Sequence, residues 1–383
     1  MKVLVQLLTL AWCVAAMFAA PAHAQQSQWD NVARVVVIGD LEGDYDKFVD
    51  MLRTAQLIDG RNSWIGGPTH LVQLGDVPDR GPNSRAIMDL LRRLEAQARR
   101  RGGRVHALIG NHEAMNVTGD LRYVHPGEYA AFVDNGSRRR REIFYRQTLD
   151  FLRANPLPTG APVMDDVFRA QWESEHPLGY VEHRRAWGSG GAYGRWVSGH
   201  NSVIRINDTF YLHGGIGPTY LAADRDAMNN AVRAALAGRQ TASHPGILTD
   251  QDGPLWYRGL STNAEDAERT HLEALLARHG VSRLVVGHSK VAPTVLPRFG
   301  GRVIVADIAV SRGQLDPHAF LIFENGAATT IHRGARVPLV ASTLAERCAY
   351  FNRIAALDPE GGPMTALASA QCAAETGALE APP

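Results

Sequence analysis

Three short polar loops contain most of the residues that could do chemistry. They are residues 39–44 (GDLEGD), residues 75–81 (GDVPDRG) and residues 110–113 (GNHE). Each begins with glycine, whose missing side chain lets the backbone turn sharply and come close to a ligand. Each then offers carboxylate, amide or imidazole groups, and the second loop adds an arginine. Because carboxylate and amide oxygens suit hard divalent cations, the three loops together predict a metal site.

A buried strand is predicted directly before each loop. Residues 35–38 (VVVI), 71–74 (LVQL) and 105–109 (VHALI) are short apolar runs that end where the loops begin. Apolar residues at helical spacing predict a helix in each interval, over residues 45–57 and 84–100. Such alternation of strands and helices predicts a parallel sheet. Loops at the carboxyl ends of parallel strands meet in one crevice, so we expect the three loops to converge.

Regular structure is also expected in the second half of the chain. The predicted strands are 202–206, 209–213, 283–286, 302–307, 319–323 and 327–332, and the predicted helices are 222–237, 265–279 and 344–357. The dipeptide Asn325-Gly326 between the last two strands is a strong hairpin signal. Asn83 is a candidate N-cap of the helix over 84–100, and Gly280 is a candidate stop for the helix over 265–279.

The order of the motifs resembles that of the calcineurin-like metallophosphoesterases, and more narrowly their phosphoprotein-phosphatase branch. The family motifs GDxHG, GDxVDRG and GNHE correspond to the three loops, and HGG and Gly-His correspond to residues 213–215 and 287–288. Residues 254–259 (PLWYRG) are similar to a segment of the bacterial Shewanella-like phosphatases. The resemblance spans residues 34–325. It implies an α/β (α+β) fold, in which a four-layer β-sandwich is flanked by helices.

The resemblance also implies two divalent metal ions. The expected ligands are Asp40 and Glu42 at the first metal, Asn111, His213 and His288 at the second, and Asp76 as a bridge between the two. Mixed carboxylate, amide and imidazole ligands suit manganese, iron or zinc. We expect manganese, with iron, zinc or magnesium as alternatives.

Glu42 departs from the family motif, which has histidine at this position. If Glu42 ligates the first metal, its oxygen and negative charge make the site harder and favour manganese or magnesium over zinc. Alternatively, Glu42 points away, and the first metal is loosely held or absent. The sequence leaves both possibilities open.

Hydrolysis of a phosphate ester is the chemistry that this resemblance implies. Two metals about 3.5–4 Å apart can generate hydroxide from bound water and hold the phosphoryl oxygens. His112 is expected to be the general acid that protonates the leaving group, oriented by Asp79. Arg80 and Arg258 are expected to bind the phosphate through their planar guanidinium groups, together with Asn111.

The implied function is a metal-dependent phosphatase that acts on phosphomonoesters. The subgroup suggests a phosphoprotein substrate, with phosphotyrosine favoured over phosphoserine and phosphothreonine, and a small phosphate ester is a further possibility. One alternative is hydrolysis of dinucleoside polyphosphates, which the same motifs serve in relatives. Another is a degenerate module that binds phosphate or a partner without catalysis, and only Glu42 argues for it.

The first 24 residues have the pattern of a secretory signal peptide. Lys2 precedes an apolar run over residues 3–18, and residues 22–24 (AHA) form an A-x-A cleavage site. The mature chain is therefore expected to begin near Gln25, to have no membrane span and to be periplasmic or secreted. Loss of Lys2 takes the formal charge from +1 to neutral, so bulk charge gives no reason to expect nucleic-acid binding.

We expect residues 25–335 to form one catalytic domain. Residues 117–200 within it lack a strand pattern, and we interpret them as a helical insertion over the active site. A cap that sets specificity and a purely structural excursion are equally open. Residues 336–383 are interpreted as a surface-docked or partly disordered tail. Cys348 and Cys372 could bridge there, because disulfides persist in exported proteins.

Overall fold

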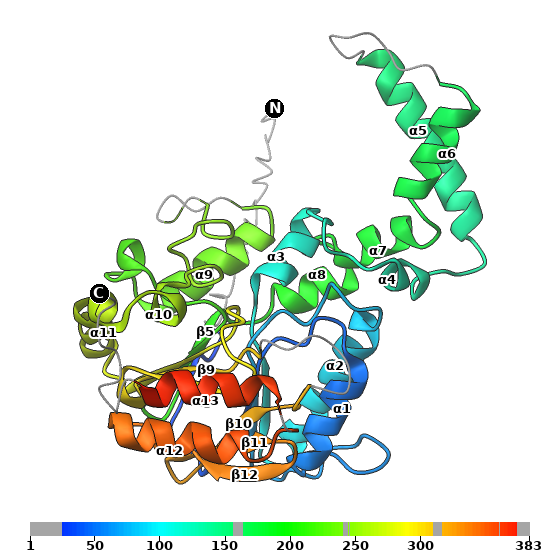
Figure 1. Cartoon of the computed structure of the whole chain (residues 1–383). Helices are drawn as coiled ribbons and strands as arrows, with labels where there is room; N and C mark the ends of the chain where they lie inside the picture. Colours follow the sequence, from blue (N-terminus) through cyan, green and yellow to red (C-terminus); the bar gives the residue numbers. More distant parts are fainter. Residues whose placement is uncertain are drawn as a thin grey trace, which may run out of the picture.

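Two six-stranded mixed sheets form the centre of the computed structural model (Figure 1). The structure describes residues 25–155, 164–239, 244, 246–308, 316–359 and 361–373. The predicted leader, residues 1–24, lies outside these ranges, as do residues 156–163 of the predicted insertion. None of the helices in the described ranges is long and apolar enough to cross a bilayer.

The two sheets are built from different parts of the chain. The first has the order β12-β11-β10-β2-β3-β4, with strands β2 (Arg34–Ile38), β3 (His70–Gln73), β4 (Arg104–Ala107), β10 (Phe320–Glu324), β11 (Ala327–His332) and β12 (Ala335–Pro338). The second has the order β1-β5-β6-β7-β9-β8, with strands β1 (Gln28–Trp29), β5 (Val203–Ile206), β6 (Thr209–Leu212), β7 (Arg283–Val286), β8 (Leu296–Arg298) and β9 (Val303–Val305).

Helices flank the sheets and fill the insertion. They are α1 (Tyr45–Thr54), α2 (Ser84–Arg100), α3 (Asn111–Thr118), α4 (Pro126–Ala130), α5 (Ser137–Ala154), α6 (Asp166–Glu175), α7 (Tyr180–Trp187), α8 (Ala192–Val197), α9 (Arg225–Leu236), α10 (Gly259–Thr262), α11 (Glu265–His279), α12 (Leu344–Ala355) and α13 (Pro363–Ala373). Two short 3-10 turns are η1 (Pro218–Tyr220) and η2 (Phe299–Gly301).

The predicted strand–helix unit at the start of the chain is confirmed. β2 pairs with β3 and β3 pairs with β4, both in parallel, and α1 and α2 connect them. Helix α2 has the predicted bounds, with Asn83 at its N-cap. The carboxyl ends of β2, β3 and β4 therefore lie at one edge of the first sheet, which is where the three polar loops begin.

Alternating side chains of β2 divide the core into layers. Val35 and Val37 lie in an apolar cluster with Ile204 of β5 and Tyr211 of β6, which belong to the other sheet. Val36 and Ile38 lie in a second cluster, with Phe48 of α1. The sheets thus pack face to face, with helices outside them, and the predicted four-layer arrangement is confirmed. Burial of each such side chain contributes about 1.5–3 kcal/mol relative to an exposed position.

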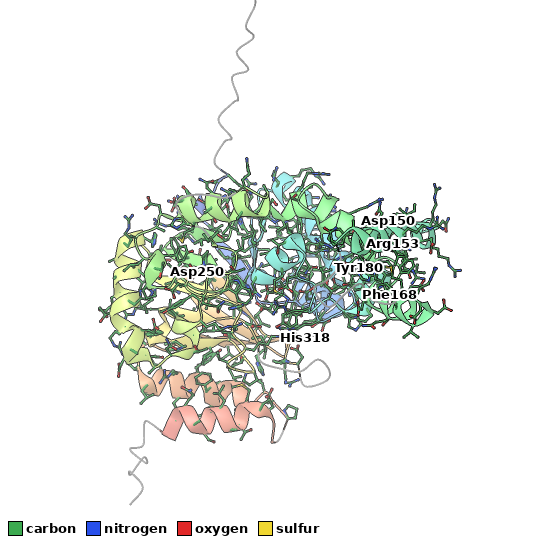
Figure 2. All side chains as sticks on the ribbon, turned by 90° about the horizontal axis from the view of Figure 1, so that it is seen from above. Asp150, Arg153, Phe168, Tyr180, Asp250 and His318 are labelled. Carbon is green, nitrogen blue, oxygen red and sulfur yellow. A yellow bond between two sulfur atoms is a disulfide. The ribbon has the colours of Figure 1, made fainter. Side chains whose placement is uncertain are left out.

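The insertion is helical, as predicted, but much of it points away from the sheets. Figure 1 shows α5 and α6 side by side in an arm that projects from the body. Figure 2 shows the same arm from above, with Asp150, Arg153 and Phe168 labelled on it. The contact of the insertion with the motif loops comes from its first part, through Tyr123 and Glu128.

The segment after residue 335 is integrated into the domain as far as residue 373. β12 pairs with β11 at the edge of the first sheet. Tyr350, Phe351 and Ile354 of α12 are fully or almost fully buried in the cluster between the sheets. A disulfide joins Cys348 of α12 to Cys372 of α13, with their Cα atoms 5.0 Å apart. The bridge that the sequence left open is therefore present.

Candidate active site

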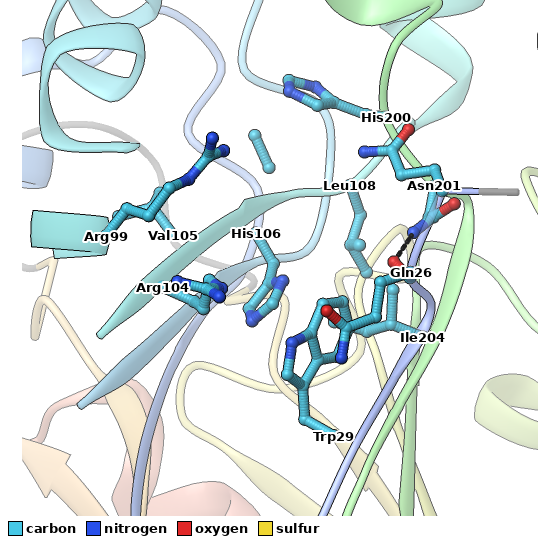
Figure 3. Close-up of a pocket in the computed structure, with 12 residues that line it drawn as sticks. Gln26, Trp29, Arg99, Arg104, Val105, His106, Leu108, His200, Asn201 and Ile204 are labelled. Atoms are coloured by element: carbon cyan, nitrogen blue, oxygen red, sulfur yellow. Dashed lines mark hydrogen bonds between the residues drawn. The ribbon is translucent and has the colours of Figure 1, made fainter. Parts of the chain in front are cut away.

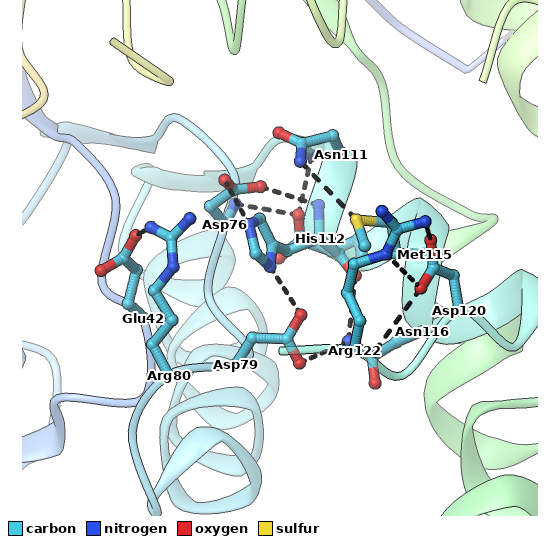
Figure 4. Close-up of polar contacts among 12 residues, drawn as sticks. Glu42, Asp76, Asp79, Arg80, Asn111, His112, Met115, Asn116, Asp120 and Arg122 are labelled. Carbon is cyan, nitrogen blue, oxygen red and sulfur yellow. Dashed lines mark hydrogen bonds and ion pairs between the residues drawn. The ribbon is translucent and has the colours of Figure 1, made fainter. Parts of the chain in front are cut away.

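Hydrogen bonds tie the three motif loops together. The backbone amides of Leu41 and Glu42 both donate to the carbonyl oxygen of Asp76, at 3.0 Å each. The buried carboxylate of Glu113 accepts from the amides of Asp76 and Gly110, at 2.9 and 2.7 Å. Glu113 thus serves as the link between the second and third loops, and the expected convergence of the loops is confirmed (Figure 4).

Four residues of these loops, and His288 of the Gly-His motif, have unusual backbone conformations. The φ angles of Glu42, Asp76, Asp79, Arg80 and His288 are +48°, +55°, +75°, +58° and +64°. Residues other than glycine rarely enter this left-handed region. Such strain persists where the surroundings impose it, and it is concentrated at functional sites. The fold therefore holds these five side chains in directions that a relaxed loop would not give them.

Lone pairs converge at the imidazole of His213. Its Nδ1 lies 2.9 Å from the carbonyl oxygen of Leu74, so Nδ1 carries the proton and Nε2 carries a lone pair. That Nε2 lies 2.9 Å from Asn111 Oδ1, 3.1 Å from His288 Nδ1 and 3.2 Å from Asp76 Oδ1. Several acceptors that face one another at this distance repel unless a cation lies among them. The donor set fits a divalent metal of the mixed oxygen and nitrogen type.

The protonation states of these residues also suit a metal. Ligand atoms of Asp76, His213 and His288 all lie within 4.8 Å of one another. Burial lowers the pKa of His288, and the neighbouring His213 lowers it further, so the ring is neutral. Burial opposes ionisation of Asp76, but His213 and His112 hold its pKa below the usual range. A neutral imidazole and an ionised carboxylate are the forms that bind metals.

Asp40 lies next to this cluster. Its Oδ1 accepts from the amide of His288 at 3.2 Å and lies 3.9 Å from His213 Nδ1. Burial, Asp307 and Asp76 all raise the pKa of Asp40, an effect that a bound cation would reverse. Asp307 is buried too, and its Oδ2 has no hydrogen-bond partner among the described residues. Asp307 was not among the predicted site residues, although it follows β9 much as Asp40 follows β2.

A histidine–carboxylate pair faces the same cluster. His112 Nδ1 lies 2.6 Å from Asp79 Oδ2, and His112 Nε2 lies 3.7 Å from Asp76 Oδ2. Asn116 donates to the other oxygen of Asp79 at 2.9 Å. Burial lowers the pKa of His112, but the charges of Asp76 and Asp79 outweigh it, and the net shift is upward. A protonated His112 can therefore donate from Nε2.

Glu128 of the insertion supports this pair from behind. Its Oε1 accepts from the backbone amide of Asp79 at 2.8 Å and from the hydroxyl of Ser84. Burial raises the pKa of Glu128 to about 8. Glu128 was not among the predicted site residues, because no local pattern connects a helix of the insertion with the second motif loop.

One cavity contains most of the predicted site residues. Its volume is about 330 Å³, and its lining is Asp40, Asp76, Arg80, Asn111, His112, Tyr123, Trp256, Arg258, His288 and Lys290. His213 lies beneath it, fully buried. Tyr123, Trp256 and Lys290 were not among the predicted functional residues. The cavity thus combines metal donors, a histidine acid and three cationic side chains.

The predicted phosphate-binding arginines both line the cavity. Arg258 Nη1 donates to the carbonyl oxygen of His288 at 2.5 Å, which fixes it beside the metal donors. The guanidinium of Arg80 lies 5.4 Å from the centre of the Tyr123 ring. Trp256 approaches His288, with 5.6 Å between ring centres. One aromatic ring of the cavity lining therefore lies against a cation, and another lies beside a proposed metal donor.

Glu42 lies against cations instead of among the metal donors. One of its carboxylate oxygens is bonded to Arg80 Nη1 (Figure 4). The other is bonded to Lys290 Nζ. Among the residues that the structure describes, Asp76, His213 and His288 form a group that could hold a metal ion, and Glu42 is not part of that group. Of the two possibilities left open by the sequence, this geometry favours a Glu42 that points away from the metals.

Two other histidines lie apart from the site. Figure 3 shows His106 and His200 beside a different pocket, which Trp29 also lines. His106 Nε2 lies 3.2 Å from His70 Nδ1, and His200 Nε2 lies 3.0 Å from Glu95 Oε1. Both rings thus have side-chain partners away from the metal donors.

A family model of calcineurin-like phosphoesterases matches residues 33–292, about two thirds of the chain. The chain belongs to the calcineurin-like phosphoesterase family. It is 28% identical over 303 residues to Shewanella-like protein phosphatase 2 of Arabidopsis thaliana, with 76% of this chain and 75% of that protein covered. It is 29% identical over 324 residues to an uncharacterised protein of Schizosaccharomyces pombe, with 80% and 82% covered.

Solved structures agree with this family assignment. The crystal structure of a cold-active protein-tyrosine phosphatase of a psychrophilic Shewanella species matches with a TM-score of 0.60 and 27% identity. The match covers 82% of this chain and 84% of that one. The predicted family and fold are confirmed, and the chain is a phosphatase of the metallophosphoesterase type.

Proposed function

We propose that this phosphatase hydrolyses phosphomonoesters with two divalent metals and prefers phosphotyrosine in proteins to phosphoserine and phosphothreonine. The observation that carries the proposal is the position of the His112–Asp79 pair. The Nε2 of His112 lies 3.7 Å from Asp76 Oδ2, in the cavity that Arg80 and Arg258 also line. A proton donor, metal ligands and phosphate-binding cations therefore share one small volume.

The residues of the chain have distinct parts in this reaction. When bound, two divalent cations would lower the pKa of a bridging water and neutralise phosphoryl oxygens. Arg80 and Arg258 donate hydrogen bonds to the phosphoryl oxygens and stabilise the charge that grows there. His112 gives the Nε2 proton to the leaving oxygen, and Asp79 stabilises the imidazolium before the transfer.

We propose a ligand role for the predicted metal-binding residues other than Glu42. Asp76, Asn111, His213 and His288 would hold one cation, and Asp40 with Asp76 would hold the other. We propose manganese for both, because the donors mix carboxylate and amide oxygen with imidazole nitrogen. Iron and zinc suit the same set of ligands and serve as the comparison metals in the test.

Two observations support phosphotyrosine as the substrate. The similar Shewanella protein is a protein-tyrosine phosphatase, and its structure matches over most of this chain. Tyr123 and Trp256 both line the cavity next to the phosphate-binding cations. An aromatic leaving group can pack against such rings, whereas the short side chains of phosphoserine and phosphothreonine gain much less from them.

The test compares phosphopeptides that differ only in the phosphorylated residue. With manganese-loaded protein, we expect kcat/KM for the phosphotyrosine peptide to exceed that for the phosphoserine and phosphothreonine peptides by about tenfold or more, from roughly 1.4 kcal/mol of ring contact. Replacement of Trp256 by alanine should reduce this preference. Equal rates for the three peptides would contradict the preference, and faster cleavage of a dinucleoside polyphosphate would favour the alternative substrate class.

We also propose that the mature protein begins near Gln25 and works in the periplasm or outside the cell. The Cys348–Cys372 disulfide supports this proposal, because such bridges persist in oxidising compartments and are rare in the cytosol. Cell fractionation with intact-mass measurement tests it. We expect a mature chain that lacks residues 1–24, and a cytosolic full-length chain would contradict the proposal.

A further inference from the structure

Glu42 joins two cations at the edge of the cavity. Arg80 Nη1 bonds to Glu42 Oε1, and Lys290 Nζ bonds to Glu42 Oε2. The side chain of Glu42 is only 10% exposed, whereas the side chains of Arg80 and Lys290 are 41% and 35% exposed. The carboxylate is thus covered by the two cations, which themselves face the solvent-accessible cavity.

We propose that Lys290 is a third phosphate-binding cation, and that Glu42 positions Lys290 and Arg80 for the substrate phosphate instead of ligating a metal. This inference rests on the proposed function for the identity of the substrate. It assigns to Lys290 a role that the motifs do not predict, and it gives a reason for the departure from histidine at position 42.

The charges around Lys290 support a role in anion binding. Lys290, Arg80 and Arg258 all line the cavity that contains Asp40, Asp76 and His112. One buried carboxylate between two cations leaves a net positive charge beside Arg258. A phosphate dianion can be bound by such a group, with arginine as a planar donor and lysine as a compact point charge.

A carboxylate at position 42 also offsets the repulsion between Lys290 and Arg80. Two cations held close together repel each other, and the repulsion grows as water is excluded from the site. The negative charge of Glu42 offsets this repulsion and gives each cation a defined position. A histidine at position 42 could not accept from both cations, so it would leave Arg80 and Lys290 without this anchor.

The lysine content of the chain permits a selective test. The sequence has only three lysines, namely Lys2, Lys47 and Lys290. Lys2 belongs to the predicted leader, and Lys47 pairs with Asp316 at 2.9 Å, with 11% of its side chain exposed. In the mature chain, an amine-acetylating reagent therefore has Lys290 as its main side-chain target and Lys47 as an internal control.

The first experiment measures acetylation of Lys290 by mass spectrometry in the metal-loaded protein, with and without inorganic phosphate. We expect phosphate to slow acetylation of Lys290 by about tenfold at saturation, while acetylation of Lys47 and of the terminal amine is unchanged, because an ammonium bound to phosphate is not nucleophilic. Equal acetylation of Lys290 with and without phosphate would overturn the role of Lys290.

The second experiment compares three variants for metal content and for inhibition by phosphate. In Lys290→Met we expect the inhibition constant for phosphate and KM for an aryl phosphate to rise about tenfold, the usual size for loss of one charge-assisted hydrogen bond. We expect kcat to change less, and Lys290→Arg to restore most of the affinity. All three variants should keep the metal content of the parent protein.

The third variant, Glu42→Gln, separates positioning from ligation. Like Lys290→Met, it should raise the inhibition constant for phosphate and KM for an aryl phosphate. We expect the number of metals per chain to remain unchanged. Loss of one metal in Glu42→Gln, measured by elemental analysis of the folded protein, would show that Glu42 is a ligand and overturn that half of the proposal.

These readouts also distinguish this inference from the proposed function. Protection of Lys290 by phosphate and the metal count need no turnover. A protein that shows protection but hydrolyses no phosphomonoester would reject the phosphatase proposal and keep the phosphate site. An active phosphatase in which phosphate does not protect Lys290 would keep the phosphatase proposal and reject the phosphate site. The acetylation experiment uses the chain without substitutions. It therefore decides the role of Lys290 even if a variant fails to fold.

Discussion

His112 Nδ1 lies 2.6 Å from Asp79 Oδ2, the shortest contact between the second and third motif loops that we describe. Asp79 is itself fixed by hydrogen bonds from Asn116 to its carboxylate and from its own amide to Glu128. This arrangement leaves the other ring nitrogen of His112 directed at Asp76, 3.7 Å away. The pair thus links a buried carboxylate to the edge of the metal donors, as a positioned acid requires.

Replacement of His112 by asparagine should slow substrates with poor leaving groups most. An alkyl oxide needs a proton as it leaves, whereas a nitrophenolate leaves readily without one. We expect kcat for an alkyl phosphate to fall by about 10²–10⁴-fold, the usual contribution of general acid catalysis, and kcat for p-nitrophenyl phosphate to fall far less. Equal losses for the two esters would count against His112 as the acid.

Replacement of Asp79 by asparagine should change the pH dependence of kcat. The charges of Asp76 and Asp79 raise the pKa of His112 against the opposing effect of burial. The acid form is present below this raised pKa, so activity is lost as pH rises through it. Without the Asp79 charge the pKa of His112 falls, and the alkaline loss of activity should move to lower pH. An unmoved alkaline limb in Asp79→Asn would show that another group causes it.

Glu128 should make the fold less stable as pH rises. Burial raises its pKa from 4.5 to about 8, so the folded chain keeps a proton that the unfolded chain loses. Stability from this source is present below pH 4.5 and is lost as pH rises through about 8. Between pH 5 and 8 the parent protein should lose on the order of 3 kcal/mol of its free energy of unfolding from this source, measured by urea unfolding. We expect Glu128→Gln to remove this loss.

A substitution on the exposed arm provides the control for this measurement. Glu175 lies at the exposed end of α6, so Glu175→Gln should leave the pH slope of the parent protein unchanged. If Glu128→Gln has the same slope as the parent, Glu128 is ionised in the folded chain at neutral pH, and its proposed neutral state is wrong.

Loss of the Cys348–Cys372 disulfide should lower the free energy of unfolding and leave kcat unchanged. The bridge closes a loop with a sequence separation of 24 residues. In the chain-entropy model a loop of this size stabilises by about 3 kcal/mol, so we expect Cys348→Ser with Cys372→Ser to lower the free energy of unfolding by that amount. The bridge lies outside the cavity lining, so kcat of the folded variant should be unchanged. A parallel loss of kcat would show that α12 and α13 act on the site.

The parts of the fold that the sequence predicted well have local causes. Helix α11 ends at Gly280, which has φ +60°, as its stop signal predicted. The hairpin of β10 and β11 turns at Asn325 and Gly326, whose φ angles are +49° and +85°. The three motif loops converge because each follows a parallel strand of the same sheet. In each case the residue type and its spacing contain the necessary information.

The parts that escaped prediction depend on contacts between distant segments. β1 has only two residues and exists because it pairs with β5. Glu128 reaches Asp79 from the insertion, and Lys290 reaches Glu42 across 248 residues of sequence. Neither contact has a local pattern. The direction of the arm formed by α5 and α6 likewise follows from packing at its base, which periodicity within each helix does not encode.

The most direct test of the account is hydrolysis of an aryl phosphate by metal-stripped protein, with manganese, magnesium, iron or zinc added back singly. We predict no turnover without metal, restored turnover with manganese, and two metals per folded chain. Asp76→Asn should lose both the turnover and bound metal, because Asp76 is proposed to ligate both cations. Full activity of the metal-stripped protein, or of Asp76→Asn, would contradict a metal-dependent mechanism at this site.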